Sequence, residues 1–252
     1  MASSSSERWL HVLRDPALDG PENMARDEHL LYDEVLRPAA LRLYGWQPAT
    51  ISLGYFQRYQ QLAGLPDELQ RLAVVRRPTG GGAILHDREV TYALIVDDSL
   101  LVARRAPSEL YRLVHTCWRD ALATDVAACR LAPEALPLPS PRSGPFFCFE
   151  KPARTDLIVD GQKLLGSAQR RIPGRVLQHG SLLLGRRFAS HPGADLHEPP
   201  PERVQRWIAG FVGRLADALA LQPRHTDWTP PQLHDVAVRR RRYASPEWTH
   251  RR

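Results

Sequence analysis

The stretch Arg76-Arg77-Pro78-Thr79-Gly80-Gly81-Gly82-Ala83-Ile84-Leu85-His86-Asp87 places three consecutive glycines between two β-like runs, with paired arginines before them. Because glycine has no Cβ, a backbone of three glycines can lie directly against a ligand. A phosphate loop of the Walker type would need a following Lys-Ser or Lys-Thr, and a dinucleotide loop would need GxGxxG before a helix. Neither pattern is present. A glycine triplet alone also suits an ordinary turn, so the surrounding sequence must decide what this loop binds.

Hydrophobic periodicity on both sides of the loop predicts short strands and three helices. The clearest strand is 89–96, where alternate residues are apolar. The Asp160-Gly161 pair predicts a type I′ hairpin between residues 156–159 and 163–168, and a further strand at 176–184 would complete a three-stranded meander. The other strands are expected at residues 9–14, 41–44, 50–53 and 74–77, and the helices at residues 22–36, 108–122 and 202–221.

The sequence shows no internal repeat and no clean linker, so we expect one continuous domain over residues 1–252. Residues 223–252 are rich in proline and arginine, which predicts a weakly structured extension. The arginine runs at 239–242 and 251–252 are expected to form a solvated tail. Residues 132–145 are rich in proline and serine and predict a long irregular connection, which suggests function or mobility.

Composition limits the class of protein. A chain of 252 residues can bury a sizeable core, and its formal net charge of +6 favours acidic partners. The polar start at residues 1–6 lacks the pattern of a secretory signal, and no apolar run is long enough to span a bilayer. Cys117, Cys129 and Cys148 are odd in number and form no CxxC pair, which argues against a disulfide framework and against a zinc site. A reducing cytoplasm is the expected compartment.

A cysteine and a lysine carry the candidate chemistry. Cys148 opens the segment Cys148-Phe149-Glu150-Lys151-Pro152 ahead of the predicted hairpin, and Lys163 lies on the second strand of that hairpin. A cysteine needs a nearby cation to be a thiolate at neutral pH, and Lys163 is the candidate for that cation. Because three phenylalanines surround Cys148, an ordinary buried thiol that packs as a small hydrophobe is the alternative.

Read together, these segments resemble the lipoate-protein ligase and octanoyltransferase family, which includes the related biotin-protein ligases. The resemblance covers nearly the whole chain and implies an α+β fold, a mixed β-sheet with flanking helices. In this fold the glycine-rich loop and the lysine-bearing strand would wrap around an acyl chain. The motifs that carry the resemblance are Glu22-Asn23-Met24-Ala25, Ser52-Leu53-Gly54, the stretch from Arg76 to Asp87, Lys163 with Gly166-Ser167-Ala168-Gln169, Gln178-His179-Gly180, and residues 243–248.

The resemblance also implies roles for individual residues. Lys163 would lie at the acyl carbonyl, holding its oxygen and assisting the acceptor amine, and no metal is expected. Arg170, Arg171 and Arg175 would form a surface toward an acidic carrier protein. The residues expected to line the acyl site are Arg76, Gly80, Gly81, Gly82, His86, Gly166, Ser167, Ala168 and His179.

Cys148 decides the branch of the family that the chain resembles. Cysteine-dependent octanoyltransferases that otherwise resemble lipoate ligase A carry Cys-Phe-x-x-Pro-Ser ahead of the lysine strand, and this sequence has Ala153 in place of the serine. The resemblance implies that the Cys148 thiolate takes an octanoyl group from acyl carrier protein, without a cofactor. The group would pass to the lysine of a lipoyl domain or of the glycine-cleavage H protein.

We expect a cytoplasmic monomer that binds neither nucleic acid nor membrane. Two other functions stay open on the sequence. One is an ATP- and magnesium-dependent lipoate ligase, which would form an acyl-adenylate and need no cysteine. The other is a non-catalytic protein that only holds an acyl chain.

Overall fold

A mixed β-sheet forms the centre of the computed structural model, which describes residues 8–136 and 144–252. Its order is β11-β1-β2-β6-β10-β9-β8-β7, with β1 parallel to both neighbours and the other pairs antiparallel. A small second sheet has the order β4-β3-β5. The mixed sheet that the resemblance implies is confirmed. The strands are β1 (Trp9–Leu18), β2 (Ala39–Trp46), β3 (Thr50–Leu53), β4 (Ala73–Arg76), β5 (Ile84–His86), β6 (Glu89–Asp97), β7 (Arg130–Leu131), β8 (Leu157–Val159), β9 (Gln162–Ile172), β10 (Arg175–Leu183) and β11 (Gln222–His225).

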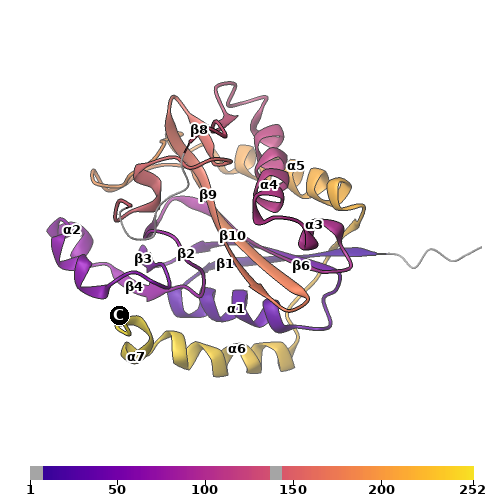
Figure 1. Ribbon diagram of the computed structural model, residues 1–252, viewed down its shortest axis with the longest axis horizontal. Helices are drawn as coiled ribbons and strands as arrows, with labels where there is room; N and C mark the ends of the chain where they lie inside the picture. The colour runs from indigo at the N-terminus through magenta and orange to yellow at the C-terminus, as the bar shows by residue number, and fades with distance from the viewer. Residues whose placement is uncertain (1–7, 137–143) are drawn as a thin grey trace, which may run out of the picture.

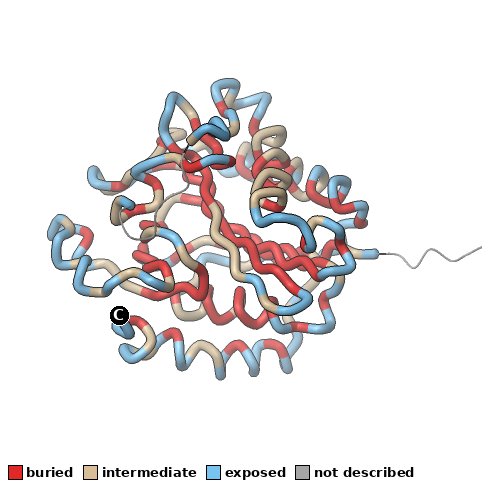
Figure 2. The backbone as a smooth tube through the Cα atoms, viewed as in Figure 1, coloured by how far each residue is buried: buried red, intermediate tan, exposed pale blue. Residues whose placement is uncertain are grey.

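Helices cover both faces of the large sheet (Figure 1). Helices α4 and α5 lie over one face and α1 and α6 over the other, and the strands between them are buried (Figure 2). Trp118 of α4 stacks on Phe211 of α5 with ring centroids 4.0 Å apart, whereas Met24 of α1 and Tyr243 of α6 belong to the core on the opposite face. The helices are α1 (Gly20–Tyr32), α2 (Asp67–Gln70), α3 (Leu101–Arg104), α4 (Pro107–Leu122), α5 (Pro201–Leu219), α6 (Pro230–Tyr243) and α7 (Pro246–Thr249), with 3-10 turns η1 (Tyr59–Gly64) and η2 (Cys148–Glu150).

The hairpin between β8 and β9 has the predicted turn. Asp160 and Gly161 have φ angles of 50° and 80°, the left-handed pair that a type I′ turn needs. Strands β8, β9 and β10 are neighbours in the sheet, so the predicted meander is confirmed. This meander places Lys163 near the start of β9, next to the segment that carries Cys148.

The expectation of a weakly structured tail after residue 222 was wrong. Strand β11 extends the large sheet, and α6 packs along α1 with Val236 and Tyr243 buried. Arg242 pairs with the buried Glu28 of α1, and Arg240 pairs with Asp19 at 2.6 Å. Arg240 and Arg242 therefore bridge α1 and α6 instead of lying in a solvated tail, whereas Arg251 and Arg252 are exposed as expected. A helix with so few apolar positions lacks the periodicity by which a sequence predicts burial.

Arg175 also differs from its expected place. Its side chain is buried, and the guanidinium donates a hydrogen bond to the carbonyl oxygen of Asp33, so it does not belong to an exposed surface. Arg170 and Arg171 are at least partly exposed.

The predicted irregular connection over residues 132–145 includes residues 137–143, which lie outside the described residues. The organisation as one continuous domain stays a prediction. No helix within residues 8–136 or 144–252 is long and apolar enough to cross a membrane.

Candidate active site

Cys148 and Lys163 meet as the sequence predicts. The Lys163 Nζ lies 3.2 Å from the Cys148 Sγ and 3.3 Å from the Cys148 carbonyl oxygen. Cys148 is the first residue of η2 and is partly exposed, while the lysine side chain is buried. An ammonium group so close to a sulfur stabilises its thiolate form, which is the nucleophilic form of cysteine.

Asp156, which the sequence analysis did not select, completes this cluster. Its Oδ2 lies 2.8 Å from the Lys163 Nζ and also accepts a hydrogen bond from the backbone N–H of Ala153 at 2.7 Å. Burial alone would lower the pKa of Lys163, but the Cys148 thiolate and the Asp156 carboxylate hold it above the ordinary lysine value. Lys163 is therefore a cation at neutral pH and cannot act as a base.

Gly166 leaves space for the Lys163 side chain, and Ser167 forms hydrogen bonds to neighbouring side chains. Neither residue lines the cavity described below. A Cβ on Gly166 would fall 2.1 Å from the Lys163 Cε, so the glycine leaves room for the amine. The Ser167 hydroxyl is hydrogen bonded to the Tyr92 hydroxyl at 2.6 Å and to the His115 Nε2 at 2.7 Å.

The glycine loop folds around the side chain of Arg77. The buried guanidinium donates hydrogen bonds to the carbonyl oxygens of Gly80 and Gly82, each at 2.7 Å, and to that of Ser52 at 2.9 Å. Burial lowers the pKa of Arg77 to about 10, which leaves it charged at neutral pH. A fixed positive charge thus lies inside the loop.

The same loop holds the backbone of Cys148. The N–H of Cys148 donates to the carbonyl oxygen of Ala83 at 2.8 Å, and a Cβ on Gly82 would come within 3.0 Å of the Cys148 nitrogen. A Cβ at Gly54 would fall 1.9 Å from the carbonyl oxygen of Gly81. Gly81 and Gly82 therefore allow close packing of loop, arginine and cysteine, and none of Gly80, Gly81 and Gly82 lines the cavity.

Arg76, which was expected to line the acyl site, does not line the cavity described below. Its guanidinium donates to the carbonyl oxygens of Gly54 at 2.8 Å, Gln57 at 2.7 Å and Thr249 at 2.8 Å. Because successive residues of a strand point to opposite sides, Arg76 and Arg77 cannot share one environment. Arg76 ties the end of the chain to the loop after β3, and Arg77 is the arginine at the cavity.

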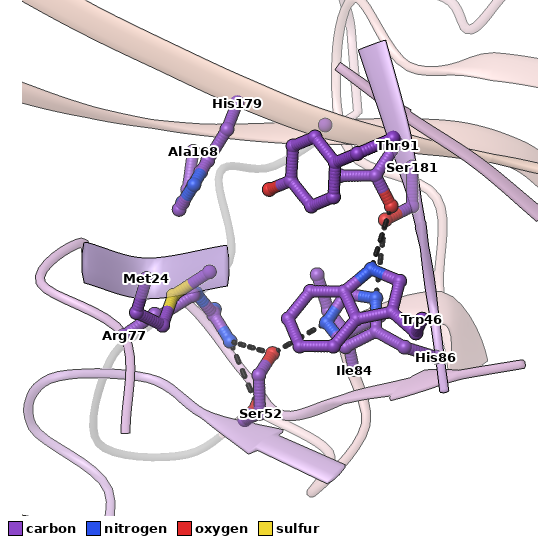
Figure 3. Close-up of a pocket in the computed structure, with 12 residues that line it drawn as sticks. Met24, Trp46, Ser52, Arg77, Ile84, His86, Thr91, Ala168, His179 and Ser181 are labelled. Carbon is purple, nitrogen blue, oxygen red and sulfur yellow. Dashed lines mark hydrogen bonds between the residues drawn. The ribbon is translucent and has the colours of Figure 1, made fainter. Parts of the chain in front are cut away.

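A small cavity with a mostly apolar surface lies beside this loop (Figure 3). Three of the residues expected at the acyl site, His86, Ala168 and His179, line this cavity. The indole of Trp46 stacks on the His86 ring with centroids 3.8 Å apart, and the sequence did not identify Trp46. The remaining lining residues are Met24, Tyr44, Ser52, Arg77, Ile84, Thr91, Gly180 and Ser181.

Polar groups behind the lining satisfy one another. His86 is hydrogen bonded through Nε2 to the Ser52 hydroxyl at 2.7 Å (Figure 3). Its Nδ1 is bonded to Glu89 at 2.8 Å, and burial lowers the pKa of its imidazole. His179 is bonded to the hydroxyl of Thr79 at 2.7 Å and to Asp27 at 3.0 Å. With their nitrogens occupied, both rings present carbon to the cavity, which suits a hydrocarbon chain.

The two other cysteines have no comparable setting. Cys117 and Cys129 are buried, and burial raises the pKa of each thiol to about 11. They pack as small hydrophobes. Among residues 8–136 and 144–252, no group of three His, Cys, Asp or Glu side chains is arranged to hold a metal ion.

Comparisons with known proteins identify the family of this chain. Residues 19–220 match the lipoyl protein ligase A/B catalytic domain. Octanoyltransferase LipM of Halalkalibacterium halodurans is 40% identical over 200 residues, which are 76% of this chain and 70% of that protein. Octanoyltransferase LipM of Lysinibacillus sphaericus is 33% identical over 261 residues, covering 90% and 93% of the two chains.

Solved structures share the fold at lower identity. A putative lipoate protein ligase from T. acidophilum superposes with a TM-score of 0.75 at 17% identity, covering 98% of this chain and 99% of that one. A lipoate-protein ligase A bound with ATP gives a TM-score of 0.72 at 17% identity, with 97% and 98% coverage. Taken with the match over residues 19–220, these similarities show that the chain belongs to the lipoyl protein ligase A/B catalytic domain family.

Proposed function

We propose that this chain is a protein N-octanoyltransferase that carries the octanoyl group as a thioester on Cys148. The observation that carries the proposal is the 3.2 Å approach of the Lys163 ammonium to the Cys148 sulfur. The apolar cavity beside the glycine loop has a suitable lining for an eight-carbon chain. Relatives named octanoyltransferase, at 33–40% identity, support the same activity.

In the first step the Cys148 thiolate attacks the carbonyl carbon of an acyl thioester. The new bond joins this carbon to the Cys148 sulfur, and the carrier's thiolate leaves. Negative charge develops on the carbonyl oxygen during the attack. The Lys163 ammonium lies where it can donate a hydrogen bond to that oxygen, and a donor of this kind contributes roughly 10²–10³ in rate.

In the second step an acceptor lysine with a neutral amine attacks the same carbonyl carbon. An amide bond forms, the carbon–sulfur bond breaks, and the Cys148 thiolate is regenerated next to the Lys163 ammonium. The acceptor nitrogen loses its proton to solvent. Because Lys163 is a cation, it assists this step as a hydrogen-bond donor and does not remove the proton.

The partners and setting belong to the same proposal. The donor is octanoyl acyl carrier protein, and the acceptor is the lysine of a lipoyl domain or of the glycine-cleavage H protein. Both carriers are typically acidic, which fits the net charge of +6. The enzyme would work as a cytoplasmic monomer without a cofactor, a metal, a nucleic acid or a membrane.

Mass spectrometry of the enzyme tests this function. Incubation with octanoyl carrier protein, without ATP, should add one octanoyl group to Cys148 and then modify a lipoyl domain. Cys148→Ser should abolish both products, and Cys117→Ser, which changes a buried thiol, should keep both. Modification that requires ATP, magnesium and free octanoate, and that Cys148→Ala performs equally well, would make the chain a ligase. Acyl binding without any transfer would make it a binding protein.

A further inference from the structure

The position of Lys163 allows a side reaction that would inactivate an enzyme that works through a thioester. Its Nζ is 3.2 Å from the sulfur that would carry the acyl group, so the carbonyl carbon would be about 3–3.5 Å from the amine, a near-attack distance. A neutral Lys163 could form an amide bond to this carbon. The carbon–sulfur bond would break, and the proton from the nitrogen would pass to the Cys148 sulfur. The octanoyl group would then be fixed on Lys163, and the enzyme would be inactive.

This side reaction would be fast if the lysine lost its proton. An ordinary lysine is neutral in roughly one molecule in 2,500 at pH 7. Effective concentrations of about 10⁵–10⁸ M for well-oriented neighbouring groups can outweigh such a small fraction. Burial would speed this side reaction, because it favours the neutral amine. The Lys163 side chain is only 3% exposed.

Formation of the acyl-enzyme removes one of the two negative charges beside Lys163. The Cys148 thiolate and the Asp156 carboxylate both stabilise the ammonium ion in the free enzyme. A thioester carries no charge, so Asp156 is the anion that remains once Cys148 is acylated. Within the described residues, Asp156 is the one carboxylate in an ion pair with Lys163, at 2.8 Å.

We propose that Asp156 keeps Lys163 protonated while Cys148 carries the acyl group, so that only an external lysine can take that group. This inference rests on the proposed function. Asp156 acts through Lys163 and does not itself touch the acyl carbon. It makes the acyl-enzyme long-lived enough to meet its acceptor.

The fold holds Asp156 firmly in this place. The preceding residue, Thr155, has a φ of 71°, a left-handed conformation that is strained for a β-branched residue. Its carbonyl oxygen accepts a hydrogen bond from the His115 Nδ1 at 2.6 Å, and the His115 Nε2 is bonded to the Ser167 hydroxyl. Strain of this kind persists only where the surroundings enforce it. The network from α4 and β9 thus fixes the backbone that carries the carboxylate.

Two titratable groups that pack near Lys163 and Asp156, His115 and Tyr111, are uncharged at neutral pH. Burial lowers the pKa of His115 to about 4, so its imidazole is neutral. Burial raises the pKa of Tyr111, whose hydroxyl therefore keeps its proton. Phe149 contributes only the face of its ring, 5.1 Å from the Lys163 Nζ. Asp156 is left as the group that controls the lysine charge.

The chemical stability of the octanoyl adduct tests the inference. Wild type, Asp156→Asn and Asp160→Asn are acylated with octanoyl-CoA, which needs no carrier docking, and then treated with hydroxylamine, which cleaves thioesters but not amides. Asp160 is an exposed turn residue on the same hairpin, and asparagine tolerates its positive φ, so its variant is the matched control. Peptide mapping locates any adduct that survives.

Asp156→Asn should carry a hydroxylamine-stable octanoyl group on Lys163, at least about tenfold more than wild type, because each unit of lysine pKa changes the neutral fraction tenfold. Asp160→Asn should behave as wild type. If Asp156→Asn does not fold, wild type alone serves: its stable Lys163 adduct should form about tenfold faster per pH unit between pH 7 and pH 10. A labile thioester on Cys148 with no Lys163 adduct in the variant or at any pH would overturn the inference. Absence of any thioester on wild type would overturn both this inference and the proposed function.

Discussion

Gly166 lies so close to Lys163 that a single methyl group on the glycine would reach 2.1 Å from the lysine Cε and 2.5 Å from its Nζ. The two residues belong to β9, three positions apart, and the strand pairing is irregular here, with a register shift between β8 and β9. The buried amine therefore occupies space that any other residue at 166 would need. The position of the ammonium ion depends on the absence of one side chain.

Gly166→Ala should displace the Lys163 amine from Cys148. We expect thioester formation on Cys148 to slow by about tenfold or more, because small misplacements of a catalytic group are costly. The steric conflict should cost about 1–3 kcal/mol in the free energy of unfolding. Stopped acylation reactions and thermal unfolding measure the two effects. Gly213→Ala in α5 is the control and should leave the acylation rate unchanged, because a Cβ at Gly213 would meet open space. If Gly166→Ala is acylated at the wild-type rate, the steric explanation is wrong.

Lys163→Met should remove the hydrogen-bond donor to the acyl oxygen. Single-turnover acylation of Cys148 should fall by roughly 10²–10³, the usual cost of one oxyanion donor. The variant should also be less stable, because Asp156 would keep a buried charge without a partner. Lys151→Met, which changes an exposed lysine three residues after Cys148, is the control. Acylation at the wild-type rate in folded Lys163→Met protein would contradict the proposed role.

Ala168→Leu should shorten the cavity. Ala168 lines this small cavity, and three added carbons would exclude part of an octanoyl chain that enters it. Losing the burial of two or three methylenes costs about 2 kcal/mol, so the ratio of kcat/KM for octanoyl over butanoyl donors should fall roughly 30-fold. Competition between the two donors measures this ratio directly. An unchanged ratio would mean that the acyl chain binds elsewhere.

His115 should make the protein less stable in mild acid. Its pKa is about 4 in the folded protein, whereas the unfolded chain has an ordinary histidine value near 6.5. Between these values only the unfolded state takes up the proton, so stability falls as the pH falls through 6.5 and stops falling from this cause near pH 4. From pH 7 to pH 5 the loss from this group is about 2 kcal/mol.

Denaturant unfolding at several pH values checks this expectation. His115→Asn can still donate to the Thr155 carbonyl but does not titrate, so the variant should lose about 2 kcal/mol less than wild type between pH 7 and pH 5. His86 and His191 also have lowered pKa values from burial, so they add a slope of the same sign to both proteins. Equal slopes for wild type and His115→Asn would show that His115 does not contribute.

Local sequence patterns alone predict the main strands and helices and the contact between Cys148 and Lys163. Local chemistry fixes these features: the Asp160-Gly161 turn allows only one kind of hairpin, and alternating apolar residues mark Glu89–Asp97 as a strand. The spacing of a cysteine segment and a lysine on the following hairpin was enough to pair Cys148 with Lys163. Turn geometry acts over a few residues, so a single chain displays it.

The tertiary structure alone decided the rest. Whether Arg76 or Arg77 reaches the cavity depends on which side of β4 faces the loop, and the identity of two adjacent arginines carries no such information. The arginine-rich end forms α6 because Glu28 and its neighbours on α1 supply ion-pair partners more than 200 residues away in sequence. Asp156 gained its importance only through contact with a buried lysine. Charge pairing and burial are properties of distance in space, and a sequence states only distance along the chain.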